Sequence, residues 1–241
     1  MTLAFDALDM SDSPLARLDP RWKLAALAII ILVTGFLRTV PTIVMVLAIS
    51  VLLLALARLP RQFLFWRLGT FLLLLAFFLV FLPITQGWEG LNATWKVGSR
   101  ALAIYCFGLV LLATAPFATT IHAAQSLGLP RIFAHITLLS YRYIFVLADE
   151  FSRIRLALRL RGFRNRMDRH SYRTIGNVAG SLLVRGTDRA ERIAWAMHCR
   201  GFDGRFRSLN QFQTRFWDIL FFVVMIVLAA GLLAWDVMLR M

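Results

Sequence analysis

Apolar and polar residues fall into long blocks along the chain, and these blocks predict helices. Five runs are almost uniformly apolar, and short polar or proline-containing stretches separate them: 24–37, 42–57, 68–82, 97–115 and 216–235. The first two are shorter than the roughly 20 residues that a perpendicular membrane span needs, but Trp22, Lys23 and Arg38 can snorkel to the interface. The pattern therefore predicts five membrane-spanning helices.

Between residues 117 and 215 the pattern becomes amphipathic. A short helix over about 118–127 is expected to stop at Gly128, and Pro130 opens a long helix that ends at Arg161. A basic linker, 162–177, follows. A second long helix is expected from about Val178 to Arg200.

The first half of the long helix, 132–148, is apolar enough to be mistaken for another span. If it crossed the membrane, the arginine-rich residues after it would lie outside, and a central Arg142 would cost about 2.5 to 3.5 kcal/mol. We therefore expect this helix to lie beneath the bundle, on its cytoplasmic side.

Two segments that start 39 positions apart, 149–163 and 188–202, read almost alike. They share Asp, Arg, Ile, Ala, Arg, Gly and Phe at equal offsets. Four of these recur every four positions and so form one stripe along a helix. The stripes are Asp149, Arg153, Ala157 and Arg161 in the first copy, and Asp188, Arg192, Ala196 and Arg200 in the second.

Each stripe ends in an Arg followed by Gly162 or Gly201, the usual chemistry for ending a helix. One Arg-Gly pair would be an ordinary helix C-terminus. Two pairs with the same Asp, Arg and Ala upstream favour a functional role. The repeat therefore predicts a protein partner with two acidic grooves, one for each cation-tipped helix end.

Composition and charge agree with a membrane protein whose basic part faces the cytoplasm. Of the 241 residues, 59% are hydrophobic, and the mean hydropathy is +0.70. Segment 117–215 holds 17 Arg, no Lys and 6 acidic residues. It therefore contributes +11 to the chain's net charge of +14. The positive-inside rule places this segment and the loop with Arg58, Arg61 and Arg67 inside, and 84–96 outside. The N-terminus is acidic, unlike that of a signal peptide, so we expect it not to be cleaved. It is expected in the cytoplasm, and the C-terminus is expected outside.

Patterns that would indicate catalysis or a bound metal are missing from the sequence. The chain has no P-loop and no HExxH, GxSxG or CxxC motif. Cys106, Cys199 and the four histidines lack the spacing of a disulfide or metal site. We therefore expect no enzyme activity, cofactor or metal site. The arginines should attract anionic lipid, but the fixed spacing of the motifs favours a protein partner over nucleic acid.

These residues resemble the T component of energy-coupling factor (ECF) transporters, most closely its cobalt-uptake, CbiQ-like branch. The resemblance covers nearly the whole chain and rests on motifs that occur together in order. They are Ser13-Pro14-Leu15, Leu18-Asp19-Pro20-Arg21 with Lys23, Leu127-Gly128-Leu129-Pro130-Arg131, Tyr141-Arg142-Tyr143, both Arg-Gly motifs, and the run Ala196 to Gly204.

In that family two cytoplasmic coupling helices cross, and their Ala-Arg-Gly ends dock one on each subunit of an ATPase dimer. The matching residues here are Leu160-Arg161-Gly162 and Cys199-Arg200-Gly201, so the alanine of each triplet is replaced. The resemblance implies that ATP is hydrolysed on the partner and that a separate metal-binding, M-type membrane subunit holds the substrate. It also allows a small accessory membrane subunit.

The predicted protein is thus an all-α integral membrane protein of the bacterial inner membrane, with a cytoplasmic coupling domain of two long helices and one short amphipathic helix. Its expected parts are a bundle (1–116), the coupling helices (117–213) and a fifth span with a tail (214–241). Nickel or vitamin import are alternative activities. A membrane enzyme or a lipid-binding protein is the alternative from another class.

Overall fold

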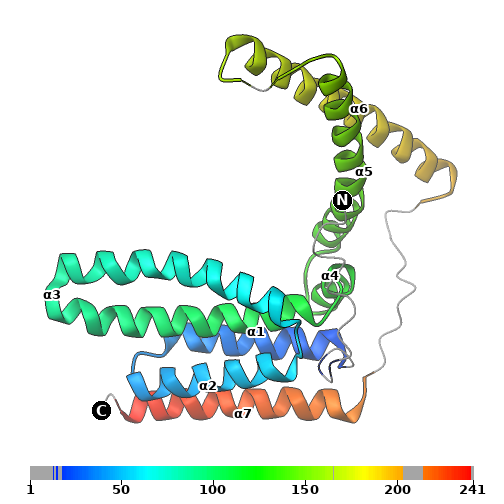
Figure 1. Cartoon of the computed structure of the whole chain (residues 1–241). Helices are drawn as coiled ribbons and strands as arrows, with labels where there is room; N and C mark the ends of the chain where they lie inside the picture. Colours follow the sequence, from blue (N-terminus) through cyan, green and yellow to red (C-terminus); the bar gives the residue numbers. More distant parts are fainter. Residues whose placement is uncertain (1–12, 14, 16–17, 165, 203–213, 240–241) are drawn as a thin grey trace. The chain divides into compact units, whose positions relative to one another are not determined.

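The computed structural model describes residues 13, 15, 18–164, 166–202 and 214–239, without the side chains at 61, 78–89 and 91–93. Some residues used in the predictions lie outside this range: Pro14, 203–213 and the N-terminal aspartates before residue 13. The structure does not test the motif and topology predictions that involve them. All regular structure in the described residues is α-helical (Figure 1), as predicted. The chain divides into two compact units, Met1–Leu129 with Asn210–Met241, and Pro130–Leu209.

The first unit is a bundle of five helices, packed mainly around the first of them. They are α1 (Pro20–Phe36), α2 (Val40–Leu56), α3 (Arg61–Ala113), α4 (Phe117–Ser126) and α7 (Phe216–Met238). Helix α1 packs against α3, α4 and α7, and α2 packs against α3. Leu27 and Ile30 of α1, Ile43 and Val46 of α2 and Phe107 of α3 are fully buried in one apolar core. Helix α4 therefore packs with the bundle, while the functional boundary placed before it remains a prediction.

Helix α3 replaces the two separate spans and the outer loop that the sequence suggested. It is helical throughout, across Pro83 and the expected loop 84–96, but it doubles back on itself (Figure 1). The Phe71 ring stacks on Tyr105 with 4.3 Å between ring centroids, and the Tyr105 hydroxyl donates to the Arg67 carbonyl at 3.2 Å. A straight helix would hold these residues about 50 Å apart. The prediction that 84–96 forms a loop was therefore wrong, whereas its location on the outer side stays a prediction. Two antiparallel apolar arms were expected correctly.

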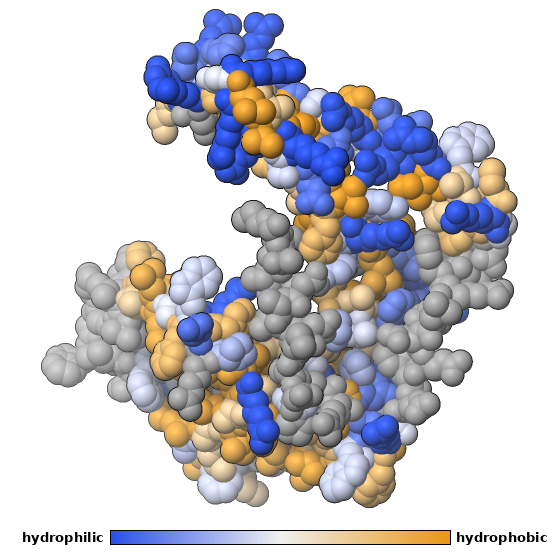
Figure 2. All heavy atoms as spheres, turned by 45° about the vertical axis from the view of Figure 1, so that its right-hand side comes forward, coloured by the Kyte–Doolittle hydropathy of each residue, from blue (hydrophilic) through white to orange (hydrophobic). Residues whose placement is uncertain are grey.

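Three helical segments are long and apolar enough to cross a membrane in the described part of the chain: Thr94–Ala113, α5 (Arg131–Leu160) and α7. Val40–Leu56 and Gln62–Phe77 are shorter apolar helices. On the face seen in Figure 2, hydrophobic residues cover much of the bundle. The protein is a membrane protein. The count of five spans, and the location of α5 beneath the membrane, stay predictions.

Two buried carboxylates of α7, Asp218 and Asp236, connect this helix to other helices of the bundle. Asp218, in the first turn of α7, accepts hydrogen bonds from its own helix start, Arg215 N, at 2.7 Å and from Asp19 N, before α1, at 2.9 Å. Asp236, near the end of α7, accepts from the backbone N–H groups of Arg38 and Thr39, which precede α2. These carboxylates satisfy donors that a helix N-terminus leaves unpaired. Helix α7 is therefore tied to the starts of two other helices.

Lys23 is a third buried polar contact, and it ties the N-terminal motif to the end of α3. Its ammonium donates to the Leu15 carbonyl at 3.2 Å and to the Thr114 carbonyl at 2.9 Å. Lys23 was expected to snorkel toward the interface, but only 1% of it is exposed. The carbonyl at a helix C-terminus has no partner within its helix, so a lysine is well matched to it.

The second unit consists of two long helices, α5 (Arg131–Leu160) and α6 (Arg169–Cys199). Helix α5 confirms the predicted bounds to within a residue. Helix α6 begins nine residues before the predicted Val178. Asp168 is its N-cap residue, without a capping hydrogen bond from its side chain, and the glycines at 176 and 180 do not interrupt the helix. The basic linker is correspondingly short. Hydrophilic residues gather over this unit in Figure 2.

Candidate functional site

The two helix ends picked out by the repeat have the same backbone geometry. Arg161 and Arg200 are the C-cap residues, and Gly162 and Gly201 follow in the left-handed region, with φ of 78° and 71°. Gly162 N donates to the Arg159 carbonyl and Phe163 N to the Leu158 carbonyl, both at 3.0 Å. Both ends therefore form a Schellman motif, in which glycine avoids the steric cost of positive φ.

The second end repeats these two bonds residue for residue. Gly201 N donates to the His198 carbonyl, and Phe202 N donates to the Met197 carbonyl, again at 3.0 Å. The shared Gly and Phe of the sequence repeat are thus the residues that build the cap. The predicted pair of matching helix ends is confirmed as a structural feature.

Helix α4 shows that this cap does not require an arginine. Its C-cap is Leu127, followed by Gly128 at φ 116°, and Leu129 N donates to the Ala124 carbonyl at 3.1 Å. The same six-to-one hydrogen bond therefore forms with an apolar residue in the arginine's place. The cap requires Gly162 and Gly201 but not Arg161 and Arg200, whose charges add at most the modest stabilisation of a cation at a helix C-terminus.

All eight members of the two stripes are exposed: Asp149, Arg153, Ala157, Arg161, Asp188, Arg192, Ala196 and Arg200. The residues in front of the arginines are exposed as well, Leu160 to 82% and Cys199 as a free thiol. Within the described residues, no salt bridge joins one member of a stripe to another. The charges of each stripe are therefore available to a partner.

We call the helix ends that carry Arg161 and Arg200 the tips. They lie on opposite sides of the point where α5 and α6 cross. One apolar groove, of about 490 Å³, separates Phe151–Phe163 of α5 from Ile175–Leu182 of α6. A second, of about 560 Å³, separates Ile136–Leu147 from Gly186–Met197. Each C-terminal half thus faces the other helix's N-terminal half. At 1.5 Å per residue, each arginine stands roughly 20 Å from the crossing.

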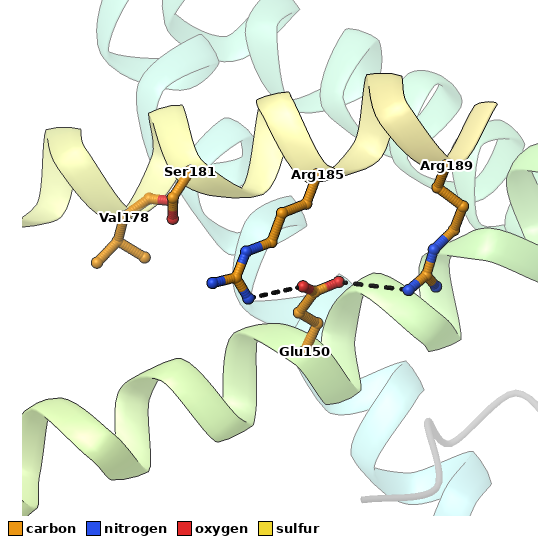
Figure 3. A network of polar contacts seen from close by, with 5 residues as sticks. All are labelled: Glu150, Val178, Ser181, Arg185 and Arg189. Atoms are coloured by element: carbon orange, nitrogen blue, oxygen red, sulfur yellow. Dashed lines mark hydrogen bonds and ion pairs between the residues drawn. The ribbon is translucent and has the colours of Figure 1, made fainter. Parts of the chain in front are cut away.

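Glu150 lies at the crossing, and sequence reasoning missed its role. Its carboxylate binds Arg185 at 2.9 Å and Arg189 at 3.8 Å, both on α6 (Figure 3). The repeat singled out Asp149 and Asp188 because both copies have Asp at that offset. At the next offset the first copy has Glu150 and the second has Arg189, so Glu150 was not part of the shared pattern. A signal existed, because Arg185 and Arg189 stand one turn apart on a helix expected to cross α5.

The described residues contain no cluster of three His, Cys, Asp or Glu side chains that could hold a metal ion. Cys106 is buried and Cys199 is exposed. The described surface of the second unit presents exposed arginines and two apolar grooves.

Alanine at Gly162 or Gly201 should loosen the tips. The left-handed backbone costs about 1 to 2 kcal/mol for a residue with a side chain, and a Cβ at either site meets no atom within 4 Å, so this cost is purely conformational. Hydrogen exchange at the Phe163 and Phe202 amides should become several-fold faster.

Gly176 is the matched control for this experiment. It lies inside α6 with φ in the ordinary range and equally open space. Gly176→Ala should slow hydrogen exchange at the Phe163 and Phe202 amides or leave it unchanged. Alanine in a helix interior is more stable than glycine by roughly 0.5 to 1 kcal/mol. Equal protection at Phe163 in the wild type and in Gly162→Ala would show that the cap is not strained by a side chain.

Known proteins resemble this chain over most of its length. The family model described as cobalt transport protein, CbiQ, matches residues 11–214. The energy-coupling factor transporter transmembrane protein EcfT of Heliobacterium modesticaldum is 28% identical over 80% of this chain and 81% of its own. The cobalt transport protein CbiQ of Rhodobacter capsulatus is 32% identical over 46% of this chain and 45% of its own. A putative fused cobalt transport protein CbiMQ of Methanocorpusculum labreanum is 31% identical over 44% of this chain and 18% of its own.

Proposed function

Because the chain belongs to the CbiQ cobalt transport protein family, we propose that it is the transmembrane coupling subunit of an ATP-driven ECF-type importer. In this proposal the Arg161 and Arg200 tips dock one on each subunit of a cytoplasmic ATPase dimer. The observation that carries it is the pair of identical caps, each bearing an exposed arginine that the cap itself does not need.

The chemistry of the tips fits carboxylate-lined grooves on a partner. A guanidinium at a helix end can form bidentate hydrogen bonds with a carboxylate beyond the last turn. Leu160 and Cys199 add an exposed apolar or weakly polar contact beside each charge, and Ala157 and Ala196 leave room one turn earlier. Asp149, Arg153, Asp188 and Arg192 would extend the contact along each stripe.

The proposed mechanism is mechanical, and the chain itself is not an enzyme. ATP hydrolysis takes place on the partner dimer, and closure of the dimer moves two tips that lie on opposite sides of one helix crossing. The bundle passes this motion to a substrate-binding membrane subunit. In this proposal that partner subunit, and not this chain, holds the substrate.

Cobalt is the proposed cargo, held by a separate metal-binding M-type subunit. The fused relative named CbiMQ supports a neighbouring M-type chain, and the CbiQ family description names cobalt. A small accessory membrane subunit and anionic lipid complete the proposed surroundings. Uptake of radioactive cobalt by cells with the full gene set, compared with nickel and vitamins, separates the three cargoes.

Copurification tests the assembly directly. Tagged chain extracted from membranes in mild detergent should bring down an ATPase pair and a substrate-binding membrane subunit. Recovery of the chain alone from membranes that contain those subunits would contradict the proposal, and substrate turnover by the chain without an ATPase would favour a membrane enzyme.

The proposed orientation places the N-terminus and the second unit in the cytoplasm of a bacterial inner membrane, and the C-terminus outside. Cysteines at Trp95 and Met167, both exposed, should react with an impermeant thiol reagent from opposite sides once Cys199 is replaced by serine. Labelling of both positions from the same side would contradict the five-span arrangement.

A further inference from the structure

The crossing of α5 and α6 is held by one carboxylate and two arginines. Glu150 Oε1 accepts a hydrogen bond from Arg185 Nη1 at 2.9 Å, and Glu150 Oε2 lies 3.8 Å from Arg189 Nη2. Figure 3 shows the carboxylate between the two guanidinium groups, which reach it from successive turns of α6. The Glu150 side chain is 18% exposed, the least of the three. We call these three residues the crossing clasp.

Apolar packing contributes little to fixing this crossing. Among the described residues of α5 and α6 only Ala134 and Ser171 are buried. Ala134 is far from Glu150 along α5, and Ser171 is far from Arg185 and Arg189 along α6. A Cβ at Gly180 or Gly186 would meet no atom within 4 Å, so no close backbone approach depends on these glycines. On either side of the crossing lies an apolar groove that residues of both helices line. The clasp is an ion-paired contact that joins α5 to α6 in this region.

We propose that Glu150 is a positioning residue that sets the crossing angle and register of α5 and α6, and thereby the spacing of the Arg161 and Arg200 tips. A carboxylate held by two arginines one turn apart resists both sliding of α6 along its axis and rotation of α6 about the crossing. Since each tip stands roughly 20 Å from the crossing, a small change of angle moves it by several ångströms. The link to coupling rests on the proposed function, whereas the effect on geometry does not.

The tip spacing can be measured on the full chain with spin labels. The native Cys199 lies beside Arg200, and Leu160→Cys places a second thiol beside Arg161. Both positions are exposed, and buried Cys106 is replaced by serine. Double electron–electron resonance in lipid nanodiscs then gives the distribution of tip-to-tip distances. With Glu150 intact the distribution should be narrow. Glu150→Gln should broaden it or shift its maximum, because the neutral amide loses the charge that holds both arginines.

A matched control and a rescue separate the clasp from a general loss of charge. Glu191→Gln removes one exposed carboxylate from α6 that has no ion pair among the described residues, so it should leave the distribution unchanged. Glu150→Arg combined with Arg185→Glu and Arg189→Glu rebuilds the clasp with reversed charge and should narrow the distribution again. Equal distributions in wild type and Glu150→Gln, or a control that broadens them as much, would overturn the inference.

Cobalt uptake by the assembled transporter tests the functional half. If spacing matters for coupling, Glu150→Gln should lower ATP-driven uptake several-fold while ATPase subunits still copurify, and the reversed clasp should restore it. An altered distance distribution with unchanged uptake would overturn the link to coupling. Failure of the proposed function would look different, since the wild-type chain would then hold no ATPase at all.

Discussion

The Arg161→Glu, Arg200→Glu double variant should lose the ATPase and all ATP-driven cobalt uptake, while its insertion into the membrane is unchanged. Truncating a buried interfacial charge costs about 2 to 5 kcal/mol, since its partner carboxylates are left unpaired, and reversal adds repulsion. The tips are separated by the whole crossing, so their effects should add. Pull-down of ATPase by tagged chain measures the loss, and each single variant should retain part of the binding.

Arg164→Glu with Arg166→Glu is the control for bulk charge. Both residues are exposed and lie in the linker just beyond the first tip, so the pair changes the same net charge without touching a helix end. This control should keep most of the ATPase binding. If it abolished binding while the Arg161, Arg200 double variant transported normally, the basic segment would act through its overall charge.

Asp236→Ala should strongly destabilise the bundle. The carboxylate accepts bonds from Thr39 N at 2.8 Å, Thr39 Oγ1 at 2.6 Å, Thr42 Oγ1 at 3.0 Å and Arg38 N at 3.1 Å. Removing it leaves buried donors at the start of α2 unpaired, which we expect to cost about 3 kcal/mol or more. Thermal unfolding of detergent-purified chain, followed by circular dichroism, measures the effect.

Asp236→Asn keeps one acceptor oxygen and should fall between wild type and Asp236→Ala. Met238→Ala changes an exposed side chain two residues away and should leave the free energy of unfolding within about 0.5 kcal/mol of wild type. If alanine at 236 melted with the wild type, the carboxylate would not be the device that caps α2 and fastens α7 to it.

Local signals made the helix ends predictable. Pro130 and Gly162 bound α5 because proline suits a helix start and glycine suits positive φ, and both effects act within a few residues. The same signal gave Gly201 and the matching tips. The apolar arms of α3 followed from composition, but their connection did not, because Pro83 and the polar residues after it are typical of a loop when seen alone.

Contacts between distant residues could not be read from the sequence. Asp236 and Thr39 are 197 positions apart, and Asp218 and Asp19 are 199 apart, so only the packed bundle reveals that one caps the other's helix. Glu150 left a weak signal in the spacing of Arg185 and Arg189, but these are two among many arginines, so the pairing could not be singled out. The start of α6 was placed too late because the basic residues of 162–177 were assigned to a linker, whereas those from Arg169 onward form regular helical turns.

Site-specific photo-crosslinking tests the two-ended coupling most directly. A benzoylphenylalanine residue is introduced at Leu160, at Cys199, or at both positions of the chain in the assembled transporter. Each single position should crosslink to an ATPase subunit, and the chain with both should form a product that carries two ATPase subunits. Crosslinking of only one position to the ATPase, or of neither while the transporter remains active, would contradict it.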